Sequence, residues 1–217
     1  MFFPYKDDNP RTITPLVTYL VIGLNILIFT IQIFGQNNLI SYFAIIPNTV
    51  FTDFPYFCFT LISSTFLHGS FMHLFGNMIY LWIFGDNVEG YMGHLNFLIF
   101  YFFCGVMAGV LQTLFNPISI IPIIGASGAV AGILGSYLIL YPKAKIHSII
   151  FIFFYFTSIK IPAFIVLSFW FLIQLSNGFN SLGMNISGGI AWFSHIGGFL
   201  TGLISIYFFK KIRFLNR

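Results

Sequence analysis

A serine at the expected start of an apolar helix is the most conspicuous group in this sequence that could take part in a reaction. In "GASGAVAGILG", Ser127 lies between Gly125 and Gly128. A serine hydroxyl becomes a good nucleophile only when a base takes its proton, and His195 in "SHIGGFLTG" is a candidate for that base. No carboxylate is placed to orient the imidazole. The two motifs therefore predict acyl transfer by a dyad of Ser127 and His195.

A third motif, "HGSFMHLFGN", supplies polar groups that could stabilise an oxyanion. His73 and Asn77 are four residues apart, so they project from one face of a helix. Together with the backbone N–H of Ser127, at the positive end of its own helix, they form a set of donors for a tetrahedral intermediate. His68 is expected to support this set.

Metal catalysis is the main chemical alternative. His68, His73 and His195 could form a three-histidine zinc site. However, the sequence contains no H-E-x-x-H motif, and no carboxylate lies near these residues to act as a base. Acyl transfer needs no cofactor, so neither a metal nor a cofactor is expected.

The composition shows which kind of element must position these residues. Of the 217 residues, 58% are hydrophobic and only 6% are charged, whereas a soluble domain has roughly 25% charged residues. Most of the surface must therefore face lipid. We expect an all-α, polytopic membrane protein with a bundle of six transmembrane helices, near residues 14–34, 71–88, 95–114, 127–141, 162–175 and 190–209.

The basic residues predict the orientation of this bundle. With six spans and both termini cytoplasmic, every Lys and Arg falls in an inner segment, which is the positive-inside pattern. The net charge of +4 thus reports topology, and no nucleic-acid partner is expected. The predicted organisation is a cytoplasmic segment 1–13, a membrane domain 14–209 and a basic cytoplasmic tail 210–217. The run 146–159 is expected to lie along the interface or to dip partly into the membrane.

The fourth span is short, and this bears on the reactivity of Ser127. Fifteen residues cover about 22 Å, while the hydrocarbon core is about 30 Å thick. If Lys143 holds the inner end, Ser127 lies roughly 8 Å below the outer boundary. Because Pro117 and Pro122 interrupt the preceding segment, we expect a polar hollow there. Spans two, four and six run in the same direction, so their polar residues should meet in it.

Small residues on two of these helices predict a close contact. Ala131 and Gly135 lie on the face of Ser127, and Gly198 and Gly202 lie on the face of His195. Small residues let helix backbones approach closely in membranes, which would bring the imidazole to the hydroxyl. Gly125 and Gly128 are expected to support the serine. At the inner end of span two, Asp86 and Glu89 are expected to tie helix ends together.

These motifs together resemble the rhomboid intramembrane serine proteases, in particular bacterial members with six spans. The resemblance covers roughly residues 60 to 202, with the motifs in the same order and at similar spacing. It implies an endopeptidase that cleaves single-span membrane proteins near the outer face of the bilayer. Some members stack an aromatic residue under the catalytic histidine four residues after the serine. Here that residue is Ala131, so His195 is expected to be held less rigidly.

Two other functions remain open at this level. The chain could be a non-catalytic relative that binds transmembrane segments, or a small channel built around the polar hollow. Because no targeting extension is recognised and the resemblance is to bacterial members, we expect a bacterial plasma (inner) membrane, with the site opening to the extracytoplasmic side. The sequence leaves substrate identity and oligomeric state open.

Overall fold

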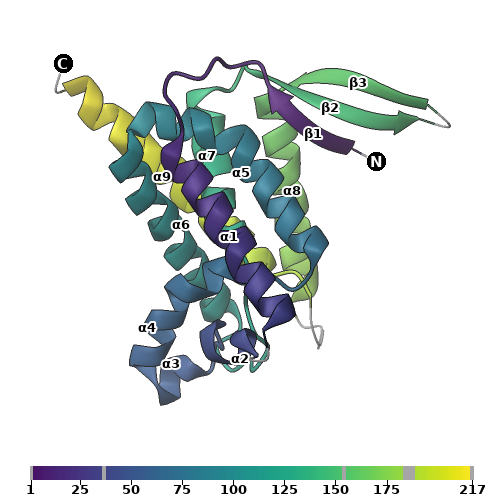
Figure 1. The fold of residues 1–217 in the computed structure, drawn as a ribbon. Helices are drawn as coiled ribbons and strands as arrows, with labels where there is room; N and C mark the ends of the chain where they lie inside the picture. The colour runs from purple at the N-terminus through teal and green to yellow at the C-terminus, as the bar shows by residue number, and fades with distance from the viewer. Residues whose placement is uncertain (1, 36–37, 153–154, 183–188, 216–217) are drawn as a thin grey trace.

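A computed structural model of the chain describes residues 2–35, 38–152, 155–182 and 189–215 (Figure 1). It is mostly helical, as expected, with a small sheet at one end. In chain order the elements are β1 (Phe2–Asp7), α1 (Leu16–Phe34), α2 (Leu39–Phe43), α3 (Thr49–Thr52), α4 (Phe54–Ser63), a 3-10 turn (Ser64–Phe66), α5 (Phe71–Met92), α6 (His94–Phe115), α7 (Ser127–Leu140), β2 (Lys145–Ile152), β3 (Tyr155–Pro162), α8 (Ala163–Ser181) and α9 (Trp192–Leu215).

Four of the described helices are long and apolar enough to cross a membrane. They are α1, α6, α8 and the part of α9 that ends at Lys211. Helix α5 is also 22 residues long, and α7 is a shorter apolar helix of 14 residues. Large hydrophobic side chains such as Leu95 and Phe169 are exposed on the outside of the bundle, as lipid contact requires.

Helix α7 lies in the centre of the bundle. Ten consecutive residues, from Gly128 to Tyr137, are buried, and the helix packs against α5, α6 and α9 (Figure 1). At about 1.5 Å per residue its 14 residues span about 21 Å, so it is shorter than the hydrocarbon core, as predicted. The segment before α7, residues 117–126, is non-helical, and backbone hydrogen bonds attach it to other parts of the chain. Ile123 forms a β-bridge with Ile45, and the N–H of Gly125 donates to the carbonyl of Ser64 at 2.9 Å.

The sheet is a departure from the all-α expectation. Strands β1, β2 and β3 form an antiparallel sheet in that order, at the same end of the molecule as the C-terminus (Figure 1). The run 146–159, expected to lie along the interface or to dip partly into the membrane, contributes to both β2 and β3, and β1 comes from the N-terminal segment. The Ile- and Phe-rich composition of this run is typical of a membrane segment. β-branched and aromatic residues favour strands equally well, and pairing with β1 decides between the two.

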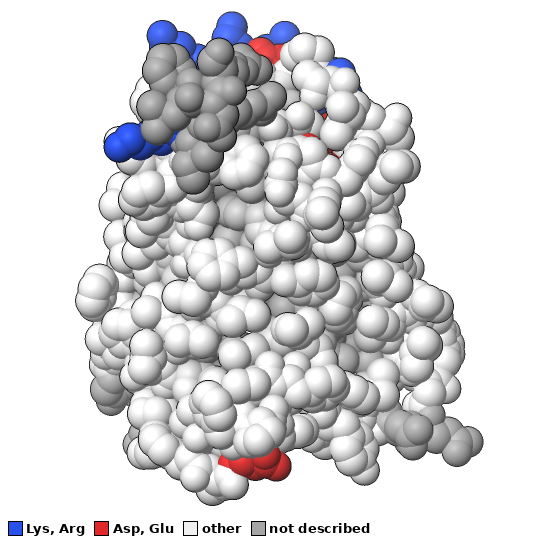
Figure 2. Space-filling view, turned by 90° about the vertical axis from the view of Figure 1, so that its left-hand side faces the viewer, with Lys and Arg blue, Asp and Glu red and all other residues white. Residues whose placement is uncertain are grey.

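The charged residues visible in Figure 2 lie near the two ends of the bundle. Lys and Arg gather at the end that carries the sheet and the end of α9, and a broad uncharged band follows (Figure 2). At the basic end, Glu89 is fully buried and accepts hydrogen bonds from the backbone N–H groups of Val17 (2.9 Å) and Thr18 (2.8 Å). Arg11 Nε lies 2.8 Å from Asp86 Oδ2. The predicted role in tying helix ends is confirmed for Glu89, while Asp86 instead pairs with the segment before α1.

Candidate active site

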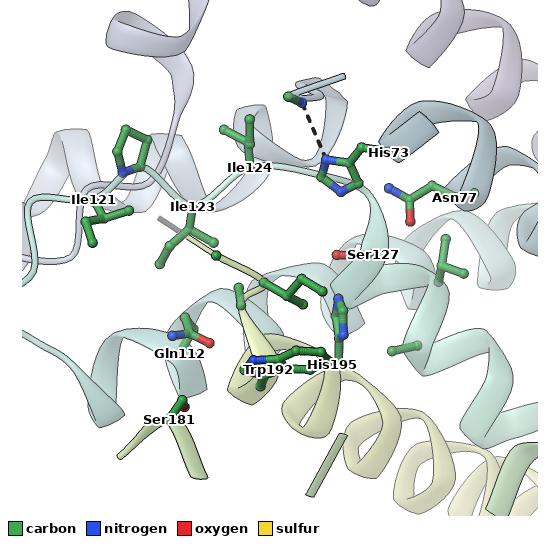
Figure 3. Close-up of a pocket in the computed structure, with 18 of the residues that line it drawn as sticks. His73, Asn77, Gln112, Ile121, Ile123, Ile124, Ser127, Ser181, Trp192 and His195 are labelled. Carbon is green, nitrogen blue, oxygen red and sulfur yellow. Dashed lines mark hydrogen bonds between the residues drawn. The ribbon is translucent and has the colours of Figure 1, made fainter. Parts of the chain in front are cut away.

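The four residues predicted to carry the chemistry line one cavity. It has a volume of about 770 Å³, and His73, Asn77, Ser127 and His195 all reach its wall (Figure 3). They come from the first turns of α5, α7 and α9, three helices that all run toward the basic end (Figure 1). The common direction brings their polar residues to one level, as expected from the sequence.

Ser127 is the first residue of α7, and the backbone before it is unusual. Gly125 has φ +119°, a conformation that side chains disfavour, and a Cβ there would lie 2.7 Å from Cε1 and Nε2 of His73. Glycine therefore lets the chain turn into α7 directly beneath the His73 ring. The first N–H groups of a helix have no acceptor within it, so the amide of Ser127 can donate toward the cavity.

Glycines set the distance between α7 and α9. A Cβ on Gly198 would lie 2.8 Å from the carbonyl carbon of Gly128, and a Cβ on Gly202 would lie 2.5 Å from that of Gly132. Ser136 Oγ also donates to the carbonyl of Gly202 at 3.0 Å. The predicted close contact is present. Its α7 face is formed by Gly128 and Gly132 in addition to the small residues expected.

His73 and Asn77 lie on one face of α5. Each side chain has a hydrogen-bond partner that decides where its N–H groups point. The N–H of Gly69 donates to His73 Nδ1 at 3.4 Å (Figure 3), which leaves the proton of a neutral ring on Nε2. Asn77 Nδ2 donates to His68 Nε2 at 3.0 Å. His68 is buried and supports Asn77, and the side chains of His73 and Asn77 both line the cavity.

The loop that carries His68 is fixed by a side chain from α1. Gln32 Nε2 donates to the carbonyl of His68 at 3.0 Å, and Gln32 Oε1 accepts from its N–H at 3.0 Å. This two-point contact holds the loop against the bundle. The sequence motifs gave no indication of Gln32, because its partner is a backbone group far along the chain.

His195 points toward Ser127 across the cavity (Figure 3). No hydrogen bond joins the Ser127 hydroxyl and the imidazole in the described part of the chain, but such contacts are often long in free enzymes and tighten with substrate. The backbone of this turn is held from α6, where Gln112 Oε1 accepts from the N–H of Ser194 at 3.0 Å.

The imidazole also has a partner that the sequence analysis overlooked. His195 Nδ1 lies 2.8 Å from Oε1 of Gln174, on α8. Although Ala131 supplies no ring beneath it, the His195 imidazole is therefore held by a hydrogen-bond partner on another helix. Gln174 is the one amide side chain in the apolar run 162–175, which was the signal that could have identified it.

Together these groups have what acyl transfer requires. A hydroxyl and an imidazole face one another, and His73, Asn77 and Ser127, the residues that could supply N–H donors, line the same cavity. The cavity is large enough to admit water and an extended stretch of peptide.

Comparison with known proteins shows which family the chain resembles. A family model described as "Rhomboid domain" matches residues 57–212. The chain is 28% identical to "Rhomboid protein 1, mitochondrial" of Saccharomyces cerevisiae, over 96% of this chain and 56% of the relative. It is 35% identical to "RHOMBOID-like protein 4" of Arabidopsis thaliana, over 66% and 32%, and 25% identical to "Presenilin-associated rhomboid-like protein, mitochondrial" of Bos taurus, over 97% and 52%.

These relatives correct one prediction and limit another. The expected bacterial plasma membrane is wrong by this comparison, because the relatives are mitochondrial and plant proteins. The chain spans about half the length of the first of these relatives, so their whole-protein activities do not transfer directly.

Proposed function

The chain belongs to the rhomboid family, and on that premise we propose that it is an intramembrane serine endopeptidase. The observation that carries the proposal is the single cavity onto which Ser127, His195 and the three oxyanion donors open. The starts of α5, α7 and α9, whose residues line it, lie away from the basic end of the bundle (Figure 1), where a peptide bond of a membrane-embedded substrate could reach them. The proposed substrates are single-span membrane proteins.

The membrane arrangement that fits this function has six spans. We assign them to α1, α5, α6, α7, α8 and α9, with both termini at the basic end. The positive-inside rule places that end on the inner side of the membrane. Helix α7 then begins below the opposite surface, so that its serine is reached by water from that side.

The proposed reaction follows from the positions of the groups. The Ser127 hydroxyl attacks the scissile carbonyl carbon while the free ring nitrogen of His195 takes its proton. The carbonyl oxygen becomes an oxyanion, which accepts hydrogen bonds from His73, Asn77 and the Ser127 amide. When the C–N bond breaks, the imidazolium gives its proton to the leaving amine. A water molecule then hydrolyses the acyl-enzyme by the same proton transfers.

The test is cleavage in a defined membrane. The purified full chain is reconstituted in proteoliposomes with a fluorescently labelled single-span substrate, and its serine reactivity is measured separately with an alkyl fluorophosphonate. We expect wild type to cleave and to be labelled, and Ser127→Ala and His195→Ala to lose both activities.

Ser136→Ala is a matched control, since Ser136 is also a serine of α7 but is not among the described residues that line the cavity, and its hydroxyl donates to the Gly202 carbonyl. It should retain cleavage and labelling. Cleavage that persists in Ser127→Ala would refute the proposed nucleophile. Binding of the substrate without cleavage or labelling by wild type would support the non-catalytic function instead.

A further inference from the structure

The imidazole of His195 is contacted from a helix that carries none of the predicted motifs. Gln174 lies on α8, and its side chain is only 5% exposed. Its Oε1 is 2.8 Å from His195 Nδ1. A buried amide at this distance acts on the ring whether or not solvent enters the cavity.

The orientation of the Gln174 amide is fixed by a second hydrogen bond. Its Nε2 donates to the backbone carbonyl of Trp170 at 3.1 Å, one helical turn earlier. A carbonyl can only accept, so the NH₂ group must face Trp170 and the amide oxygen must face His195. The oxygen in turn can only accept, so the proton of a neutral imidazole lies on Nδ1. The lone pair on Nε2 is then free for the Ser127 hydroxyl, which is what a general base needs.

We propose that Gln174 is a positioning residue that selects the tautomer and orientation of His195, so that the site works as a Ser127–His195–Gln174 triad. The inference rests on the proposed protease function and deepens it. An amide in the third position is chemically sound, because cysteine proteases of the papain type use a Cys-His-Asn arrangement.

The surroundings of the ring also assign its positioning to α8. Ala131 supplies no ring from α7, whereas the Trp170 ring of α8 lies 5.8 Å from the His195 ring, and the Trp192 ring lies 6.2 Å from it, edge-on. The imidazole is thus bounded by aromatic rings and held by one directed hydrogen bond. One hydrogen bond is enough to orient the imidazole because the neighbouring aromatic rings leave this planar ring few other orientations.

An amide differs from a carboxylate in the charge that it brings. During attack His195 becomes an imidazolium, and a neutral amide oxygen stabilises that charge less than a carboxylate does. Gln174 should therefore affect mainly the fraction of His195 in the reactive form. Replacing it with Glu keeps an acceptor at Nδ1 and adds a charge that favours the protonated ring.

The experiment compares Gln174→Leu and Gln174→Glu with wild type in the proteoliposome assay. Asn25→Leu is the matched control, since Asn25 is likewise a buried amide that donates to the carbonyl one turn earlier, that of Val21 at 2.8 Å, but it lies on α1 away from the cavity. Gln174→Leu should lower kcat by roughly 3- to 10-fold with little change in KM, as expected for the loss of one hydrogen bond.

Gln174→Glu should recover most of kcat at high pH, with the acidic limb of its pH–rate profile moved to higher pH. Asn25→Leu should keep the wild-type kcat and pH profile, whatever its thermal stability. A purely structural Gln174 would lower stability in the Leu variant without moving kcat or the pH profile of the Glu variant, and that result would overturn the proposal.

A second readout does not depend on substrate. In ¹⁵N-histidine-labelled protein in detergent, the His195 signals, assigned by their loss in His195→Gln, should report a proton on Nδ1 in wild type and a mixture of tautomers in Gln174→Leu. A proton on Nε2 in wild type would overturn the proposal even if neither Gln174 variant folds. Wild type that neither cleaves nor reacts with fluorophosphonate would instead count against the protease function, which separates the two failures.

Discussion

The contact between α7 and α9 is the feature on which the geometry of the site depends most directly, and one methyl group tests it. In Gly198→Ala the new Cβ would lie 2.8 Å from the carbonyl carbon of Gly128 and nearer still to its oxygen. Carbon atoms make favourable contact at about 3.5–4.0 Å, so α9 must move away from α7 by roughly 1 Å. Both obstructing atoms are backbone, so no side-chain rotation can relieve the clash.

That displacement acts on catalysis more than on folding. Gly198 is three residues from His195, so a shift of α9 moves the imidazole away from Ser127 by a similar distance. A misplacement of about 1 Å can lower a rate by roughly 10²-fold. The overpacking should cost about 1–3 kcal/mol of stability, partly offset by the better helix propensity of alanine. We therefore expect kcat to fall by about two orders of magnitude, with a moderate decrease in Tm.

The assay pairs cleavage with thermal unfolding and includes a glycine-to-alanine control. Gly23 lies on α1, and a Cβ there would meet nothing within 4 Å. Gly23→Ala should leave kcat unchanged and Tm equal or higher. If Gly198→Ala matched Gly23→Ala in both measurements, the close packing of α7 and α9 would not be what positions the base.

Three further predictions concern other parts of the chain. Asn77→Ala should lower kcat by at most roughly 10²–10³-fold, and by less than Ser127→Ala in the same cleavage assay, because other oxyanion donors remain; an unchanged rate would remove Asn77 from that role. Glu89→Gln should lower Tm while leaving kcat per folded molecule unchanged, because its charged acceptor for the start of α1 is lost; an unaltered Tm would contradict this. Asp7 lies in β1, where burial raises the pKa of its carboxyl to about 6, so the folded state holds this proton more tightly than the unfolded state. Stability should therefore fall as pH rises from about 4 to about 6. Asp7→Asn should flatten this part of the curve of Tm against pH. A wild-type Tm that rose relative to the variant over this range would show that folding lowers the pKa of Asp7 rather than raising it.

The sequence predicted the helical frame and the level of the site because both follow from local chemistry. Apolar runs identified the helices that are long and apolar enough to cross a membrane, and Pro142 predicted the end of the short helix α7. The motifs around His73, Ser127 and His195 could be placed at one level because their helices run in one direction. Glycine faces on two of those helices predicted their contact, since only small side chains permit such an approach.

Other features could not be obtained in this way because they depend on segments far apart in the chain. The Ile- and Phe-rich hairpin 145–162 has the composition of a membrane segment and also that of a strand, and the choice rests on pairing with residues 2–7. Gln32 supports His68 only because α1 lies beside the loop before α5.

The sequence by itself determined that this is a mostly helical protein with membrane spans, of a recognisable family, and it singled out the serine and the histidine that line one cavity. Hydropathy, helix length and motif spacing are properties of neighbouring residues, and they suffice for that much. Only the tertiary structure decided how the base is held. A hydrogen bond of 2.8 Å from Gln174 to His195 depends on the rotation and tilt of two helices about their axes, and no local pattern encodes either.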